Sequence, residues 1–436
     1  MFGRQFIYSS AHDWPHIKSW LTLRMQPDTS VEGKVREVMD KVSRRGDEAL
    51  VEYTRHFDCR EFSIQDMQVT AAEIENSLLQ IPVDDLDIIR EAAFKIRTFH
   101  SRQARNSWFT TDPDGAFLGQ MTTPVSRAGL YVPGGQGGDT PLISSLLMNA
   151  IPAQVAGVES ICIVTPPRAD RTLNPYILAT AHLLGLDEIY ECGSAWAVAA
   201  LAYGTASIPA VDMIAGPGNI FVTTAKKLLM GQVGIDMIAG PSELAVLADS
   251  SARPDYIAAD LLSQAEHDPL AGTYLVTDDA DLMENVDNEL ENQLLSLPRA
   301  DNACKALKDW GGSFKVPDMQ TGMELINRIA PEHFELCLQD PWPMLAKVKN
   351  AGAVFLGHTS PEPVGDYFAG PNHVLPTLGT ARFSQALSVQ NFQKSISILA
   401  TDQGYLQQHA SSIARMARME NLEAHARSVE IRLKGE

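Results

Sequence analysis

The sequence VDMIAGPGN at residues 211–219 is nearly repeated as IDMIAGPSE at residues 235–243. Each copy is a short β-rich run that leads into a Gly-Pro turn, where exposed backbone N–H groups can meet a ligand. The repeat is too short to indicate duplication. Two similar loops at strand ends are still informative, because open α/β sheets bind ligands outside the carboxyl ends of their strands.

Short β-rich runs alternate with helical stretches on both sides of these loops. Upstream, strands are predicted at 129–132, 160–164, 188–192 and 211–214, with helices at 142–155, 175–184 and 195–203. Downstream, strands are predicted at 244–247, 273–276, 313–316 and 353–356, with helices beginning at 254 and spanning 282–295 and 323–329. This alternation indicates parallel sheets with right-handed crossovers. We therefore expect two α/β units that meet near residue 240.

Helical patterns flank the two units. Helices are predicted at 14–25 and 31–57, interrupted near Gly46, and again at 407–418 and 422–433, since the chain reads as mostly helical after Ser388. The expected domains are an N-terminal helical segment (1–27), a main α/β domain (28–128 plus 241–387), a second α/β domain (129–240) and a C-terminal helical arm (388–436). An arm beyond two complete sheets could pack on another subunit.

Composition excludes several classes of protein. The 436 residues are 45% hydrophobic and 20% charged, as in ordinary globular proteins with extensive cores. The net charge of −19 argues against duplex nucleic acid or an anionic membrane as partner, because both require concentrated positive charge. No run approaches the ~18 apolar residues that span a bilayer, so we expect a cytoplasmic protein. Five scattered cysteines without C-x-x-C spacing leave nitrogen and oxygen as the ligands of any metal.

An apolar helix ends in the polar turn SQAEHD (263–268), just before Pro269. Gln264 and His267 are spaced i and i+3, in line with Leu261, so both side chains should point toward protein. A buried amide beside a buried imidazole requires partners. Taken alone, the turn is typical of a polar helix end that hydrogen-bonds its neighbours. The alternative is that it forms half of a metal site.

A glycine-rich loop, PGGQGGDT (133–140), joins the strand at 129–132 to a helix. Such a layout suits phosphate. The dinucleotide fingerprint is nevertheless missing, since no frame gives G-x-G-x-x-G and TPP (165–167) follows the next strand in place of a ribose-binding carboxylate. A cofactor here would bind in an unusual manner, and a plain connecting loop is an equal alternative.

Two further segments combine carboxylates with imidazoles. Glu332 and His333 are adjacent at an element end and could act as a general base pair. The segment GDYFAGPNH (365–373) offers Asp366 as a hard oxygen ligand and His373 as either a site residue or a satisfied core histidine. Each segment alone would be unremarkable, since acid-histidine neighbours are common on surfaces.

Glu420 and His425 interrupt the C-terminal helices. At i and i+5 they would diverge by about 140° on a straight helix, so a shared site requires the helix to break. Asn421 could provide the break, because asparagine tolerates the left-handed conformation. The alternative is a solvated helix.

Taken in order, these motifs resemble the histidinol dehydrogenase family over nearly the whole chain. No single motif is decisive, but the ordered set is highly specific. It comprises LYVPGG (130–135), LMNAIPA (147–153), GPGN (216–219), AGPSE (239–243), SQAEHD (263–268), APEH (330–333) and GPNHVLPT (370–377).

The resemblance implies a set of site residues. Its zinc ligands fall on Gln264, His267 and Asp366 of one subunit and His425 of the other, and its catalytic pair falls on Glu332 and His333. Substrate contacts fall on Ser242, Gln264, His267, His333, Asp366, Glu420 and His425, with His373 as a further candidate. NAD contacts fall on Tyr131 and Asn219, with Trp196 where the family usually carries glutamine. An indole there could stack on the cofactor instead.

The resemblance also implies a fold and a reaction. The fold would comprise two incomplete Rossmann-like parallel-sheet domains with small helical segments, the C-terminal one domain-swapped in a homodimer with shared active sites. The reaction would be NAD-dependent, four-electron oxidation of L-histidinol through L-histidinal to L-histidine, the last step of histidine biosynthesis. One zinc per subunit would orient the substrate rather than generate hydroxide. His333, neutral at working pH, would take the alcohol proton, and Glu332 would activate water to hydrate the aldehyde.

Three alternatives remain open at this point. A related zinc- and NAD-dependent enzyme could oxidise another small diol, such as sulfopropanediol, although Glu420 and His425 suit the ammonium and imidazole of histidinol. A zinc hydrolase could use Gln264, His267 and Asp366, but an amide ligand and two glycine-rich loops fit it poorly. Intact Glu332 and His333 argue against a catalytically silent metal-binding scaffold.

Overall fold

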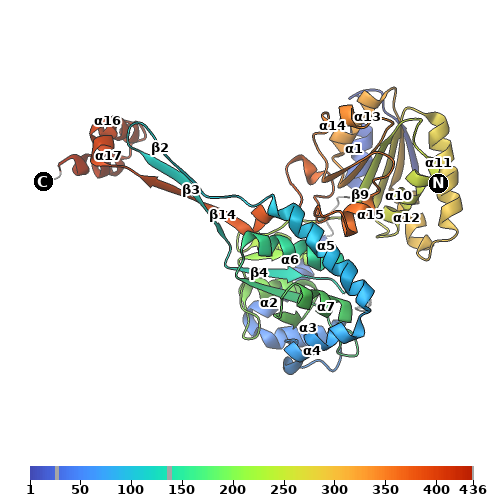
Figure 1. Cartoon of the computed structure of the whole chain (residues 1–436), viewed down its shortest axis with the longest axis horizontal. Helices are drawn as coiled ribbons and strands as arrows, with labels where there is room; N and C mark the ends of the chain where they lie inside the picture. The colour runs from blue at the N-terminus through green and yellow to red at the C-terminus, as the bar shows by residue number, and fades with distance from the viewer. Residues whose placement is uncertain (25–28, 135–139, 435–436) are drawn as a thin grey trace.

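The computed structural model describes residues 1–24, 29–134 and 140–434. They form two α/β bodies and an elongated arm that carries the C-terminus away from both (Figure 1). Most of the glycine-rich loop at 133–140, namely residues 135–139, lies outside the described residues. Within the described ranges, no helix is both long and apolar enough to cross a membrane.

The first body is built on a six-stranded parallel sheet. Its order is β1 (Arg4–Ile7), β11 (Gly311–Lys315), β10 (Gly272–Thr277), β9 (Glu243–Ala248), β12 (His333–Cys337) and β13 (Ala353–Leu356). The core on one face includes α1 (Trp14–Leu23) and α13 (Met319–Ile329), and the core on the other includes α10 (Pro254–Ala265), α11 (Ala280–Leu294) and α12 (Ala300–Trp310). Because both faces are covered, the central strands read as continuous apolar runs.

The second body is built on a five-stranded parallel sheet. Its order is β6 (Ile189–Glu191), β5 (Ser160–Thr165), β4 (Arg127–Tyr131), β7 (Met213–Ala215) and β8 (Gly234–Ile235). One core involves α4 (Ala71–Ser77), α5 (Val83–Ser101), α6 (Ile143–Ala156) and α7 (Pro175–Leu183). The opposite core involves α2 (Thr29–Arg45), α3 (Asp47–Phe57), α8 (Ser194–Tyr203) and α9 (Ile220–Leu229). The strand order reverses between β4 and β7.

The arm is an antiparallel ribbon that ends in two helices (Figure 1). Its strands run in the order β14 (Gln393–Ala400), β3 (Phe117–Pro124) and β2 (Trp108–Thr111), and its helices are α16 (Gln403–Met419) and α17 (Glu423–Glu430). The remaining short elements are α14 (Trp342–Leu345), α15 (Glu362–Tyr367) and 3₁₀ turns at Ile64–Asp66, Leu78–Gln80, Thr380–Arg382, Val389–Phe392 and Ile431–Lys434.

The mixed α/β fold with parallel sheets is confirmed, but the expected grouping of segments differs from the packing. The sequence groups 28–128 with 241–387, whereas α2 contacts α8 and α9, and α5 contacts α6, all in the five-stranded body. The N-terminal segment 1–27 supplies a strand, β1, as well as a helix. The prediction that the chain is mostly helical after Ser388 misses β14, and α12 was not predicted. The amphipathic pattern of a helix shows that one of its faces packs against protein, but it does not show which sheet that face covers.

Candidate functional site

A cavity of about 240 Å³ lies between the two bodies. From the five-stranded body it is lined by the start of α6 and by Pro217 and Gly218 of the first Gly-Pro turn. The six-stranded body contributes most of the candidates predicted from the sequence, namely Ser242, Gln264, His267, Glu332, His333 and Asp366. His373 lines the cavity from a segment whose neighbouring residues pack on the five-stranded body. The fold therefore brings together side chains that lie more than 100 residues apart in the sequence.

The two sheets present opposite ends to this cavity. The first Gly-Pro turn follows the carboxyl end of β7, as expected for a ligand-binding α/β sheet. The second turn leaves β8 and enters the amino end of β9, and His333 likewise begins β12. Both loops therefore leave carboxyl ends of strands in the five-stranded sheet, as expected, and the second loop also reaches the amino end of β9. The six-stranded sheet faces the cavity with the amino ends of its strands, and the turn after α10 lies at the same end of the sheet.

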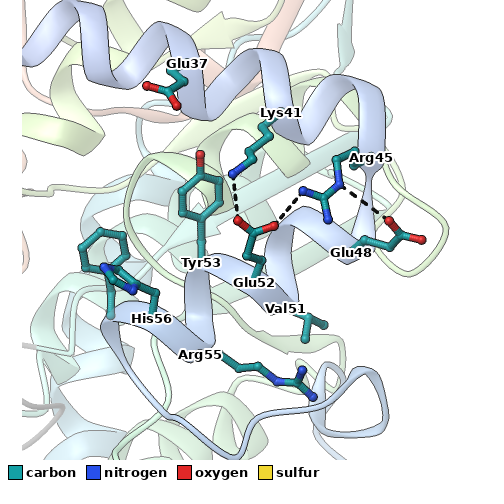
Figure 2. Close-up of a pocket in the computed structure, with 10 residues that line it drawn as sticks. Glu37, Lys41, Arg45, Glu48, Val51, Glu52, Tyr53, Arg55 and His56 are labelled. Carbon is teal, nitrogen blue, oxygen red and sulfur yellow. Dashed lines mark hydrogen bonds and ion pairs between the residues drawn. The ribbon is translucent and has the colours of Figure 1, made fainter.

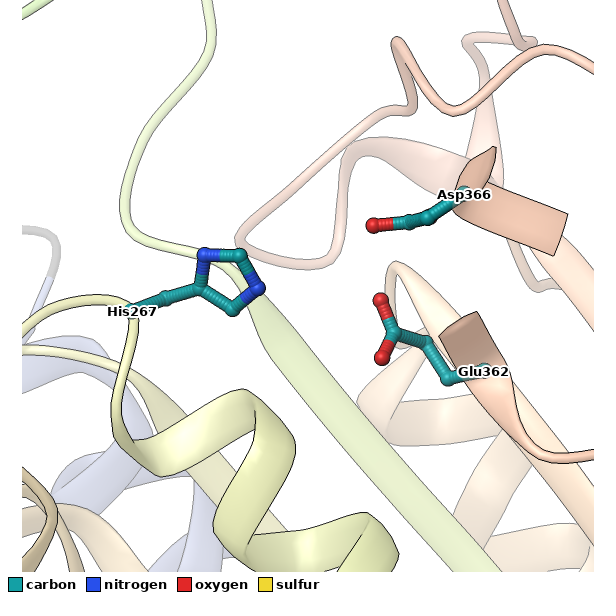
Figure 3. Close-up of side chains that lie close together, drawn as sticks. All are labelled: His267, Glu362 and Asp366. Carbon is teal, nitrogen blue, oxygen red and sulfur yellow. The ribbon is translucent and has the colours of Figure 1, made fainter. Parts of the chain in front are cut away.

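Three side chains meet as a candidate metal centre. One ligand atom each from His267, Glu362 and Asp366 lie within 4.8 Å of one another, with the two carboxylates projecting from α15 (Figure 3). Gln264 Oε1 and Asp366 Oδ1 are buried without a hydrogen-bond partner among the described residues. Unpartnered buried oxygens are costly, so this nitrogen and oxygen donor set fits a divalent cation such as zinc.

Glu362 was missed by the sequence reasoning. It precedes Asp366 by four residues on α15, a spacing that places both carboxylates on one helical face. Glu362 is 2% exposed, which is rare for a carboxylate without a specific role. The sequence therefore contained a signal for this carboxylate, namely the Glu-x-x-x-Asp spacing that directly follows Pro361.

Electrostatics also favour a cation here. His333 Nε2 lies 3.5 Å from Asp366 Oδ1 and 3.8 Å from Glu362 Oε1. Burial lowers the pKa of His333, but the carboxylates of Glu332, Asp366 and Glu362 outweigh it and raise this pKa to about 9. Burial and the charge of Asp366 raise the pKa of Glu362 to about 8. A neutral His333 thus requires that the negative charge of these carboxylates be compensated, as a metal cation held by them would do.

Glu332 is buried, and its pKa is shifted toward neutral pH. Its Oε2 accepts a hydrogen bond from the Glu243 amide at 3.1 Å, and the neighbouring Ser242 side chain also lowers the pKa of the carboxyl group. Burial raises the pKa of Glu332 to about 7, although His333 and these two groups oppose the rise. A carboxyl group with this pKa can exchange protons as a general base near neutral pH.

The predicted cofactor contacts lie on the five-stranded body. Tyr131 ends β4 and Asn219 caps α9 after β7, so both flank the point where the strand order reverses. Open α/β sheets bind ligands at such switch points. The Tyr131 hydroxyl accepts a hydrogen bond from the Ser194 amide at 3.1 Å.

Trp196 lies in the interface between α8 and α3. Its ring packs nearly parallel to those of Tyr53 and Phe57, with centroids 5.6 and 5.5 Å away. The indole is 5% exposed, and its N–H has no hydrogen-bond partner in the part of the chain that the structure describes. The indole therefore packs mainly on protein, and its contact with a cofactor stays a prediction.

A larger hollow of about 710 Å³ lies on the outer side of α2 and α3 (Figure 2). Its charged side chains pair with one another: Glu52 accepts hydrogen bonds from Lys41 and Arg45, both at 2.7 Å. None of the predicted site residues lines it. Size alone therefore does not mark the functional site.

A buried ion pair fixes the first Gly-Pro turn. Lys226 pairs with Asp236 and donates to the carbonyl of Gly216 at 2.9 Å, while Asp236 Oδ2 accepts from the Gly216 amide at 2.8 Å. Gly216 has a φ of 129°, and a Cβ there would collide with the backbone of Tyr131. The pair thus holds the turn that leads to Asn219 against the end of β4.

Replacing Lys226 with methionine is expected to lower the free energy of unfolding by about 3–5 kcal/mol, because Asp236 would remain buried without its partner. Lys227 is the matched control, since it is largely exposed and lies 3.9 Å from Glu32. Its methionine variant should change stability by less than about 1 kcal/mol. Urea unfolding of both variants measures the difference, and equal losses would contradict the role of the clamp.

Glu420 and His425 are not brought to the cavity within one chain. Both are exposed, at the end of α16 and on α17, where the arm projects away from the bodies (Figure 1). The predicted helix break is present, because α16 ends at Met419 and Asn421 has a φ of 60°.

Comparisons with known proteins agree with the resemblance. A family model described as histidinol dehydrogenase matches residues 22–433. The chain is 61% identical over 430 residues to histidinol dehydrogenase of Oleidesulfovibrio alaskensis, covering 99% of both chains. It is 58% identical over 419 residues to that of Nitratidesulfovibrio vulgaris, covering 96% of both. The crystal structure of histidinol dehydrogenase from Elizabethkingia anophelis matches with a TM-score of 0.93 at 35% identity, over 99% of this chain and 98% of that one.

Proposed function

Because the chain belongs to the histidinol dehydrogenase family, we propose that it oxidises L-histidinol through L-histidinal to L-histidine and reduces one NAD in each step. The observation that carries this proposal is the cavity that unites a candidate metal centre with the buried pair Glu332 and His333. Oxidation of another diol, such as sulfopropanediol, is not supported, because the relatives are histidinol dehydrogenases.

Gln264, His267 and Asp366 would hold a zinc ion, with the Glu362 carboxylate beside them. When bound, zinc supplies a Lewis acid that can grip the imidazole and amine of the substrate. Ser242 and His373 line the same cavity and complete the proposed substrate contacts from this chain.

His333 and Glu332 divide the proton transfers. In the first step His333 takes the proton of the alcohol, so that the carbinol carbon can release a hydride, which NAD would accept when bound. Glu332 then takes a proton from the water that adds to the aldehyde, and the resulting hydrate gives up the second hydride. Water thus supplies the second oxygen of the product carboxylate. NAD would bind on the five-stranded body, at Tyr131, Asn219 and the predicted third position, Trp196.

The arm supports a homodimer with shared active sites. Apolar side chains are well exposed along its ribbon and helices, including Trp108, Leu399, Met416 and Met419. Such a surface on a projecting arm is typical of one covered by another protein. Docking on a second copy would let Glu420 and His425 of the partner subunit reach the substrate and the metal.

The proposal is tested by stoichiometry. Purified protein with zinc, excess NAD and limiting L-histidinol should form two NADH for each substrate consumed, because each oxidation transfers one hydride. Absorbance at the NADH band and separation of L-histidine from L-histidinol give the two amounts. One NADH per substrate, or none, would rule out the four-electron reaction.

A further inference from the structure

Arg24 follows α1 and carries a buried guanidinium into the six-stranded body. Its Nη1 donates to Glu243 Oε1 at 2.8 Å and to the Tyr274 hydroxyl at 2.6 Å. Its Nε and Nη2 donate to the carbonyl of Leu270 at 3.1 and 2.9 Å. A buried charge with this many partners is held in one geometry, because each lost contact would leave a polar group unpaired.

The same guanidinium braces the turn that enters β9. Its Nη2 reaches the carbonyls of Pro241 and Ser242 at 3.3 and 3.2 Å. The Ser242 carbonyl also accepts from the Gly272 amide at 2.9 Å, and a Cβ on Gly272 would collide with Arg24. The backbone of Ser242 is therefore held between Arg24 and the start of β10.

This turn supplies a hydrogen bond to the carboxylate of Glu332. It comes from the Glu243 amide, at 3.1 Å from Oε2. Arg24 is absent from the residues that line the cavity, yet it contacts Glu243, whose amide bonds Glu332, and the preceding residue, Ser242.

We propose that Arg24 is a positioning residue that places Glu332 for hydration of the aldehyde, acting through the turn 241–243. The inference rests on the proposed role of Glu332. A shift of about 1 Å in such a group can cost about 10²-fold in rate. Loss of the brace should therefore slow the second oxidation more than the first, in which His333 takes the proton.

The test is a single-turnover experiment with dimeric, zinc-loaded enzyme in excess over L-histidinol and with saturating NAD. NADH then forms in two phases, one for each oxidation, and L-histidinal given directly isolates the second. Arg24→Met should slow the second phase at least about tenfold more than the first. Arg24→Lys keeps a charge opposite Glu243 but cannot span the carbonyls of Leu270 and Ser242 together, so its ratio of phases should be intermediate.

Arg127→Met is the matched control. Arg127 pairs with Glu188 in the five-stranded body, so the variant loses a half-buried ion pair far from Glu332 and should keep the wild-type ratio of phases. Equal slowing of both phases in the Arg24 variants would overturn the inference. If Arg24→Met does not fold, a wild-type ratio in Arg24→Lys overturns it. A wild type that forms one NADH overturns the proposed function itself, and with it the role of Arg24.

Discussion

Mixing two inactive chains, His425→Ala and Glu332→Gln, is expected to restore formation of L-histidine. In a hybrid dimer with exchanged arms, the His425→Ala body keeps Glu332 and receives an intact His425 from the partner subunit. The other site of that dimer carries both defects. Random exchange should therefore give about a quarter of wild-type activity, since half of the dimers are hybrids with one working site of two.

The measurement is L-histidine formed after the two chains have exchanged subunits, with zinc content determined in parallel. His425→Ala alone should lose zinc, whereas Glu332→Gln should retain it. His409→Ala is the control, because His409 is another histidine of the arm and is outside the predicted ligand set. Its Nε2 lies 3.2 Å from Asp114 Oδ2. Absence of recovery after demonstrated exchange would contradict a site shared between subunits.

The strands and helices of both bodies were largely visible in the sequence because their burial is uniform. The residues of β9 and β10 are buried throughout, so each strand reads as a short, mainly apolar run between turns. The strand β14 has mostly exposed residues and pairs with β3 from more than 260 positions earlier. No local pattern encodes such a pairing, which explains why no strand was predicted at 393–400.

The residues of the candidate site likewise differ in how far local sequence patterns predict them. The spacing of Gln264 and His267 predicted two buried side chains at a helix end. The structure places both at the cavity, but only Gln264 is buried, because α10 ends at Ala265 and His267 lies in the exposed turn beyond it. Glu362 was missed although its spacing to Asp366 is local. The other missed residues act through tertiary contacts: Arg24 reaches Glu243 from 219 positions away, and Lys226 meets Asp236 across a turn. Periodicity shows which face of a helix is buried, but not which buried charges will meet.

Replacing Glu332 with glutamine is expected to stop the reaction near the aldehyde. An amide of the same shape cannot accept a proton from water, so the second oxidation should slow by about 10²–10⁴-fold. The yield should fall from two NADH per histidinol toward one, with L-histidinal as the accumulating product. Undiminished formation of L-histidine would exclude Glu332 as the base.

The rate of the second oxidation is expected to follow the ionisation of Glu332. Burial raises the pKa of Glu332 to about 7, against the opposing effects of His333, the Ser242 side chain and the Glu243 amide. Because the ionised carboxylate is the base, the rate of the second oxidation should rise as pH passes through about 7 and then level off. In Glu332→Gln this limb should disappear from the residual rate.

Glu335→Gln is the control for a changed acid on the same strand. Burial raises the pKa of Glu335 well above its usual range, and glutamine resembles the protonated form that burial favours. The glutamine oxygen can also accept the Glu362 amide, which lies 2.9 Å from Glu335 Oε1. The limb should therefore survive in Glu335→Gln. If both variants lost it, the titration would belong to the shared environment of β12 and not to Glu332 itself.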